Sequence, residues 1–202
     1  CFDMKNKLLD KAKYYSVPNR IVEEPKDEIV KNIREKIELA VENELISDVP
    51  VCTILSGGID SVIITYLLSK KVDNLEAFVV SNGINEKKKD DLYYARKASE
   101  FMKIPLNEVI IDDDYVMGNL KNTIYAVEDD KWVQVSPAVA QLPMSKAIHE
   151  KGYKVVFGGE GSDEIFGSYG HIKVRYQMIY CGDQRKHFKW VVIQIFYKTI
   201  KN

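Results

Sequence analysis

The sequence lacks an excess of either charge and lacks a cysteine framework. Its 29 basic and 30 acidic residues give a formal net charge of −1, so there is no basic excess of the kind that nucleic-acid-binding proteins use. Three cysteines, at positions 1, 52 and 181, form no C-x-x-C pair and leave an odd thiol. This pattern argues against a disulfide scaffold or structural zinc site and for a reducing, cytoplasmic location. We therefore expect no nucleic-acid partner.

Long apolar runs are also missing. The longest lies near VVIQIFY at 191–197, far short of the roughly 20 residues that cross a bilayer. The first residues, CFDMKNKLLDKAKYY, contain no apolar segment typical of a secretory signal. With 46% hydrophobic residues and only 11 glycines and 6 prolines in 202 residues, the composition is that of a globular domain. We expect neither membrane insertion nor secretion.

Apolar spacing predicts helices that alternate with short buried strands. Strands are predicted at 51–55, 75–80, 106–111 and 153–157. Helices are predicted at about 26–46, 60–71 and 90–103, around 117–127, and at about 137–151, where Pro143 indicates a kink or two short pieces. This alternation predicts an α/β fold, a doubly wound parallel sheet with flanking helices. We expect residues 1–25 to be a lead-in, 26–170 the domain and 171–202 a C-terminal helical extension.

The first loop expected to carry chemistry is SGGIDS, residues 56–61, between a strand and a helix. Adjacent glycines and a helix N-terminus together favour an anion cradle, and the Ser56 and Ser61 hydroxyls are candidate donors to phosphate. The loop has neither the lysine of a Walker loop nor a third glycine. It places Asp60 in the anion site instead, which predicts Mg²⁺ between that carboxylate and a pyrophosphate group. The alternative is an ordinary turn with a capping Ser or Asp.

The second loop, GGEGSDEIFG at 158–167, follows the last predicted strand and contains three acids. If this strand and the one at 51–55 are neighbours, their loops line one crevice and Asp163 can share the metal with Asp60. Glu160 is then a candidate general base or electrostatic anchor. The alternative is a surface turn rich in capping acids. The charged run at 86–91 is either a solvated loop or a mobile flap.

The sequences of the two loops resemble motifs of known protein families. SGGIDS after a strand is similar to the pyrophosphate-binding motif of the PP-loop ATP pyrophosphatases, which have the adenine nucleotide alpha hydrolase-like fold. GGEGSDEIFGSY and SDVPVCTILSGGIDS resemble two motifs of the synthetase domain of glutamine-hydrolysing asparagine synthetases, in the same order, and the resemblance covers about residues 27–170. It implies a ligase that adenylates the aspartate side chain with Mg-ATP, releases pyrophosphate, and lets ammonia attack to form asparagine and AMP.

The resemblance also implies roles for individual residues. Asp60 and Asp163 would bind Mg²⁺, and Glu160 would handle the ammonia proton. Ser162 and Glu164 would shape the second loop. The ATP-binding residues would be Ser56, Gly57, Gly58, Asp60 and Ser61 at the pyrophosphate, Leu55 and Val80 through their backbones at adenine, and Gly158 and Gly159 at the nucleotide.

The sequence departs from the family in three places. Glu128 matches an acid of the aspartate-recognition stretch, but no matching arginine occurs in 127–145, so other carboxylates remain possible substrates. Too few residues separate Cys1 from the first loop for a glutaminase domain, so ammonia is expected from a separate domain or free in solution. The family's E-A-R-x-P segment and catalytic lysine are not found in 171–202, and a partner chain is expected to supply them. A nucleotide-binding or assembly module without turnover is the competing hypothesis.

Overall fold

The computed structural model describes residues 2–3, 8–9, 24–83 and 90–166. The strands are β1 (Phe2–Asp3), β2 (Leu8–Leu9), β3 (Val51–Ile54), β4 (Glu76–Ser81), β5 (Leu106–Ile110) and β6 (Val155–Phe157). The helices are α1 (Lys26–Glu44), α2 (Ile59–Ser69), α3 (Asp91–Met102), α4 (Asp113–Val127), α5 (Trp132–Glu150) and α6 (Ser162–Phe166). The predicted C-terminal extension, 171–202, lies outside the described residues.

The main sheet has the strand order β5–β4–β3–β6 and all its strands are parallel. From β3 the chain adds β4 and β5 on one side and then places β6 on the other side of β3. Such a reversal of strand order opens a crevice at the carboxyl ends of the two strands that flank it. Here these strands are β3 and β6, with Thr53 in register with Phe157. The two loops singled out in the sequence therefore leave neighbouring strands at the same edge of the sheet.

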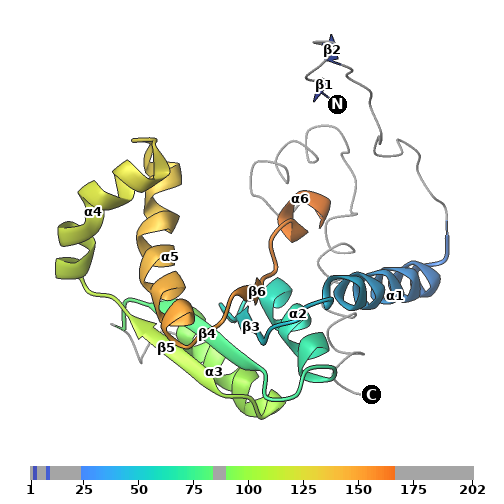
Figure 1. Cartoon of the computed structure of the whole chain (residues 1–202). Coiled ribbons are helices and arrows are strands. Elements are labelled where there is room, and N and C mark those ends of the chain that lie inside the picture. Colours follow the sequence, from blue (N-terminus) through green and yellow to red (C-terminus); the bar gives the residue numbers. More distant parts are fainter. Residues whose placement is uncertain (1, 4–7, 10–23, 84–89, 167–202) are drawn as a thin grey trace, which may run out of the picture.

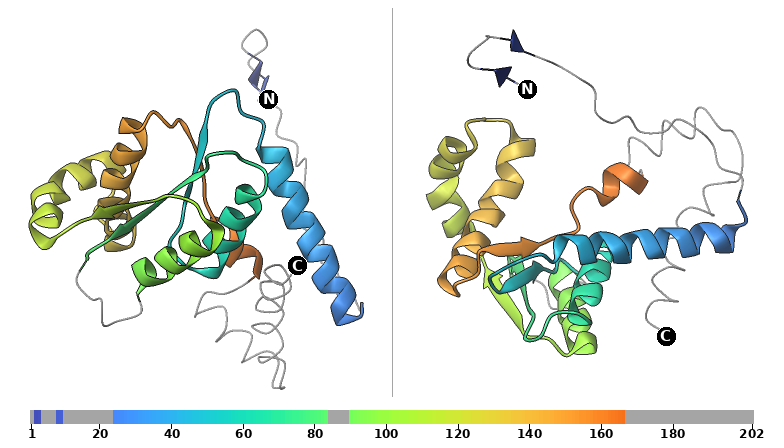
Figure 2. Two further views of the ribbon diagram at one scale, coloured as in Figure 1. Left: turned by 90° about the horizontal axis from the view of Figure 1, so that it is seen from below. Right: turned by 45° about the vertical axis from the view of Figure 1, so that its right-hand side comes forward.

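Helices cover both faces of this sheet (Figures 1 and 2). On one face Ala77 and Val79 of β4 are buried with Leu92 and Ala95 of α3. On the other face Phe78 and Cys52 are buried with residues of α5, namely Met144 and Ile148. Successive residues of a strand point to opposite faces, so β4 needs apolar residues at every central position. The predicted doubly wound parallel sheet is confirmed.

Two local predictions were wrong. Helix α5 begins at Trp132 rather than near 137, and it is one helix that includes Pro137 and Pro143. The burial of Val135 and Val139, which are 2% and 4% exposed, shows why: packing against the rest of the fold outweighs the local cost of proline. The second loop was read as loop throughout, but its residues 162–166 form the short helix α6.

Cys52 is a core residue, as its place in the first predicted strand indicated. Its side chain is fully buried in β3, and burial raises the pKa of the thiol to about 11, with a smaller contribution from the charge of Glu76. A thiol with this pKa is protonated at neutral pH and therefore inert. No helix among the described residues is both long and apolar enough to cross a membrane.

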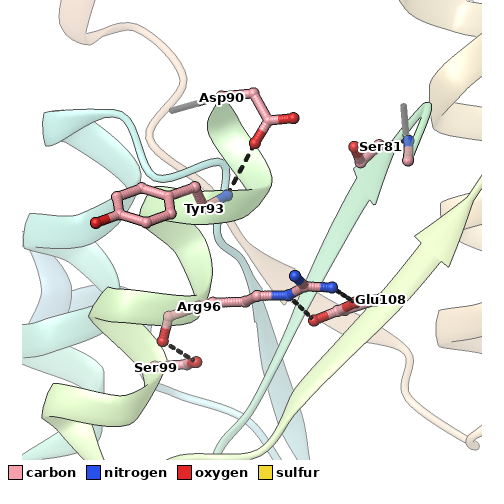
Figure 3. A network of polar contacts seen from close by, with 7 residues as sticks. Ser81, Asp90, Tyr93, Arg96, Ser99 and Glu108 are labelled. Atoms are coloured by element: carbon pink, nitrogen blue, oxygen red, sulfur yellow. Dashed lines mark hydrogen bonds and ion pairs between the residues drawn. The ribbon is translucent and has the colours of Figure 1, made fainter. Parts of the chain in front are cut away.

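A bidentate, partly exposed ion pair adds to the packing of helix α3 on the sheet. Arg96 donates from Nε and Nη2 to the two carboxylate oxygens of Glu108 on β5, each at 2.7 Å (Figure 3), and this bond from Arg96 lowers the pKa of Glu108. At the start of the helix Asp90 accepts from the Tyr93 backbone N–H at 3.0 Å, which caps the helix. The N-terminal turn of α3 is thereby a defined surface, and the first loop rests on it.

A buried pair of hydroxyls joins the three elements nearest the crevice. Thr53 Oγ1 on β3 lies 3.0 Å from Thr65 Oγ1 on α2 and 3.3 Å from the carbonyl oxygen of Phe157 on β6. Both threonines are fully buried, so their hydroxyls have no water to bond instead. The pair fixes the spacing of β3, α2 and β6 just below both loops.

We expect Thr53→Val to lower the free energy of unfolding by about 1–3 kcal/mol, because it leaves a buried hydroxyl and a carbonyl each short of one partner. Thr123→Val is the matched control. Thr123 is equally buried, but its hydroxyl donates only to the Asn119 carbonyl within its own helix, so we expect a smaller loss. Urea denaturation of the full chain measures both, and equal losses would contradict the joining role of Thr53.

Candidate functional site

The first loop is held in shape by its own hydroxyls. Ser56 Oγ and Ser61 Oγ lie 3.1 Å apart, and Ser61 Oγ donates to the Gly58 carbonyl at 3.0 Å. Leu55 is fully buried and its backbone N–H donates to the Phe78 carbonyl at 2.8 Å. In this structure the two serines therefore maintain the loop. Their expected contact with phosphate remains a prediction.

Gly57 allows the loop to lie in close contact with helix α3. Its φ of +76° lies in the left-handed region, which favours glycine. A Cβ at this position would lie 2.6 Å from Tyr94 Cβ and 2.8 Å from the Asp91 carbonyl oxygen. Both the backbone angle and the close approach therefore require glycine here.

Immediately after Gly57 the chain enters helix α2. Gly58 is its N-cap residue and Asp60 lies in its first turn. The first N–H groups of a helix have no partner within the helix, and the helix dipole adds partial positive charge at this end. The predicted anion cradle therefore has both of its physical components, backbone donors and a favourable field. Gly58 is exposed, so the cradle is open to a ligand.

The second loop contacts the first through Asp60. A Cβ on Gly159 would lie 2.9 Å from the backbone carbonyl carbon and the Cβ of Asp60 and 2.9 Å from the Ser61 nitrogen. Ser162 Oγ donates to Asp60 Oδ1 at 2.7 Å. These residues are about one hundred positions apart in the sequence, and the reversed strand order brings them into contact.

The predicted metal-binding acids fit a hard cation by their chemistry. Asp60 and Asp163 are both half-buried, and neither has an ion-pair partner among the described residues. Carboxylate oxygens are ligands that Mg²⁺ favours. Asp163 follows directly after Ser162, which contacts Asp60. No group of three or more His, Cys, Asp or Glu side chains that could hold a metal ion occurs within the described ranges.

Glu160 and Gly158 lie in the same second loop. Glu160 is exposed and has no hydrogen bond to the part of the chain that the structure describes, which leaves its carboxylate available. Gly158 is also exposed, and a Cβ there would meet only Glu160 Cγ, at 3.9 Å. The two glycines at the start of this loop therefore differ: Gly159 is required by contact and Gly158 is not.

Val80 lines a groove of about 440 Å³ at the carboxyl ends of β4 and β5, next to the start of α3. Ser81, Asn82, Asp90, Asp91, Ile111 and Ala140 complete its lining. Sequence reasoning did not find Asp90 and Asp91 because they end a charged run without a distinctive motif. Leu55 is absent from this lining, and only its backbone is a candidate to reach a ligand.

A second groove of about 350 Å³ runs between α2 and α3, beside Gly57. Its lining is mostly apolar, with Ile59, Val62, Ile63, Tyr66, Tyr94, Ala98, Phe101 and Met102 beside a single charged residue, Lys97. Lys97 Nζ lies 3.6 Å from a carboxylate oxygen of Glu100. The groove at Val80 has the more polar lining of the two, with Ser81, Asn82 and two carboxylates.

Comparison with known proteins identifies the family that this sequence matches. Residues 32–187 match the family model described as asparagine synthase. A probable glutamine-hydrolysing asparagine synthetase of Schizosaccharomyces pombe is 31% identical over 166 residues, which cover 75% of this chain and 29% of that protein. The amidase chry2 of Gibberella zeae is 30% identical over 161 residues, covering 71% and 23%. The chain thus spans less than a third of the length of these relatives.

The similarity of the backbone to a solved structure supports the fold. The U34-tRNA thiolase of Methanococcus maripaludis superposes with a TM-score of 0.51 at 21% sequence identity, over 80% of this chain and 57% of that one. The predicted adenine nucleotide alpha hydrolase-like fold is confirmed.

We expect Gly159→Ala to destabilise the protein by about 1–3 kcal/mol, because the added methyl group forces the two loops apart. Gly158→Ala is the matched control at the adjacent position, where the methyl group has room, and we expect its effect to stay within about 1 kcal/mol. Thermal unfolding of the full chain measures both. Equal tolerance of the two substitutions would contradict the contact between Gly159 and Asp60.

Proposed function

Because the chain belongs to the asparagine synthase family, we propose that it forms the ATP-binding part of an amide-forming ligase. The observation that carries this proposal is the contact of the two loops at Asp60, through Gly159 and Ser162. It brings the glycine loop at the start of α2 and the acids of the second loop to one edge of the sheet, which supports a phosphate-binding role. A phosphate-transfer site needs both.

In the proposed complex ATP lies across the carboxyl ends of β3 and β4. Its pyrophosphate binds Ser56, Gly57, Gly58, Asp60 and Ser61. Its adenosine occupies the groove at Val80, with the backbones of Leu55 and Val80 at the base. Gly158 and Gly159 face the nucleotide from the second loop. The support for this placement is that the Val80 groove and the first loop both border the N-terminal turn of α3.

Asp60 and Asp163 would hold Mg²⁺, since both are half-buried carboxylates without a basic partner in the described part of the chain. When bound, the ion would neutralise charge on the phosphate oxygens. Without a cation the carboxylate of Asp60 would repel phosphate in the same cradle.

The proposed reaction has two steps. An oxygen of the substrate carboxylate attacks the α-phosphorus of ATP, the bond between the α-phosphorus and its bridging oxygen breaks, and pyrophosphate leaves. Ammonia then attacks the carbonyl carbon of the adenylated carboxylate. The bond from this carbon to the oxygen that joins it to phosphorus breaks, and AMP leaves with that oxygen. The amide forms after one proton is lost from nitrogen. Glu160 is the proposed proton acceptor, because its carboxylate is exposed and available beside the nucleotide-facing glycines.

The proposed acyl substrate is the side chain of aspartate. One relative is named as an asparagine synthetase and another as an amidase, so the family serves more than one product. Glu128, which matches the family's acid in the recognition stretch, is exposed and ends helix α4. Ammonia would come from a glutaminase domain or from solution.

The direct test is pyrophosphate release by the full chain with Mg-ATP, aspartate and ammonium, alone and with a candidate partner. Release that depends on aspartate supports the proposal, and release that needs another carboxylate revises the substrate. ATP binding without release under any of these conditions would support the binding module instead.

We expect Asp60→Asn to weaken Mg-dependent ATP binding at least about tenfold, which is 1.4 kcal/mol. The amide oxygen can still accept from Ser162, so the substitution removes the charge and leaves the loop contact in place. Asp73→Asn, an exposed acid between α2 and β4, is the control and should bind ATP normally. Calorimetry with and without Mg²⁺ measures the effect, and unchanged Mg-dependence in Asp60→Asn would refute the metal role.

We expect Glu160→Gln to slow amide formation about 100-fold or more, while exchange of labelled pyrophosphate into ATP stays within a few-fold of normal. The reason is that only the second step needs a proton acceptor. Glu44→Gln, at an exposed position in α1, is the control. If both steps slow together, Glu160 acts in ATP or substrate binding rather than on the ammonia proton.

A further inference from the structure

We propose that Ser162 is a positioning residue that sets the orientation of the Asp60 carboxylate, and that it thereby sets the affinity of the site for the divalent ion that accompanies ATP. This inference rests on the proposed binding of Mg-ATP. It adds a residue that contacts neither the nucleotide nor the ion and acts through Asp60.

The first argument is the geometry of the bond. Ser162 Oγ donates to Asp60 Oδ1 at 2.7 Å, a short distance typical of a hydroxyl bonded to a carboxylate. An Asp side chain has a broad torsion about its terminal bond, so the carboxylate plane needs an outside partner to fix it. With Oδ1 bonded to Ser162, the second oxygen remains the free ligand.

The second argument is that the backbone of Asp60 is already fixed from the same side. Gly159 lies so close that an added Cβ would be 2.9 Å from Asp60 Cβ. Asp60 is therefore held twice by the second loop, at its backbone by Gly159 and at its carboxylate by Ser162. Holding the backbone alone would still allow the carboxylate to rotate away from the cradle.

The third argument concerns Asp163. It directly follows Ser162 in the first turn of α6, so a bond that anchors Ser162 to Asp60 also limits where Asp163 can lie. Metal affinity depends on ligands held at one spacing before the ion arrives. Loss of the Ser162 hydroxyl would loosen both proposed ligands at once, without removing either carboxylate.

The test compares Ser162→Ala, which deletes the hydroxyl, with Ser162→Thr, which keeps it. Mn²⁺ replaces Mg²⁺, and calorimetry measures ATP binding by the full chain without metal and at a series of Mn²⁺ concentrations. Ser69→Ala is the control for the same chemical change, because Ser69 lies at the far end of α2 and donates only to the Tyr66 carbonyl.

We expect Ser162→Ala to raise the Mn²⁺ concentration for half-maximal ATP binding at least about tenfold, with metal-free ATP binding unchanged. Ser162→Thr and Ser69→Ala should stay within about twofold of the unmodified chain. Thermal unfolding in the absence of ATP and Mn²⁺ shows that each variant is folded. A merely structural role would weaken binding equally with and without Mn²⁺, and this result would overturn the inference.

The outcomes also separate this inference from the proposed function. If the unmodified chain shows no metal-dependent ATP binding, the proposed function and the inference both fail. If the unmodified chain shows metal-dependent ATP binding and Ser162→Ala shows the same dependence on Mn²⁺ as the unmodified chain, only the proposed role of Ser162 fails.

Discussion

The site depends on one close contact, the approach of the second loop to Asp60. Gly159 allows the two backbones to meet because it has no Cβ, and Ser162 completes the contact with a 2.7 Å hydrogen bond to the carboxylate. Without this contact the anion cradle at α2 and the acids of the second loop would be two separate surface features. With it they lie side by side at one edge of the sheet, where the proposed metal-binding and proton-accepting residues are.

The rest of the fold serves to hold the two loops at this distance. Apolar residues on both faces of β4 bury α3 on one side and α5 on the other, which fixes the sheet. The buried hydroxyls of Thr53 and Thr65 then tie β3, α2 and β6 together just below the loops. Gly57 lets the first loop contact α3, and Leu92 and Ala95 pack that helix on the sheet, where the Arg96–Glu108 ion pair adds a partly exposed contact. Apolar packing thus sets the arrangement of the helices and strands, and the polar contacts adjust the distances between them.

Much of this was predictable because it is local. A strand such as VCTIL is buried on both faces and reads as a continuous apolar run, and SGGIDS contains its turn and helix start within six residues. One prediction failed where distant packing decided the outcome: helix α5 extends upstream of Pro137 because Val135 is buried. Helix α6 forms within the second predicted loop although none of its residues is buried. Neither the buried pairing of Thr53 with Thr65 nor the groove acids Asp90 and Asp91 follows any short motif.

The sequence by itself determined the α/β class, the order of its elements and the identity of the two loops, because hydrophobic period and turn chemistry act over a few residues. Only the tertiary structure decided that β3 and β6 are neighbours, since a strand order cannot be read from periodicity. It also decided that Ser162 rather than another side chain bonds Asp60. That bond spans about one hundred residues and exists because the packed sheet brings two strand ends within reach of a single hydrogen bond.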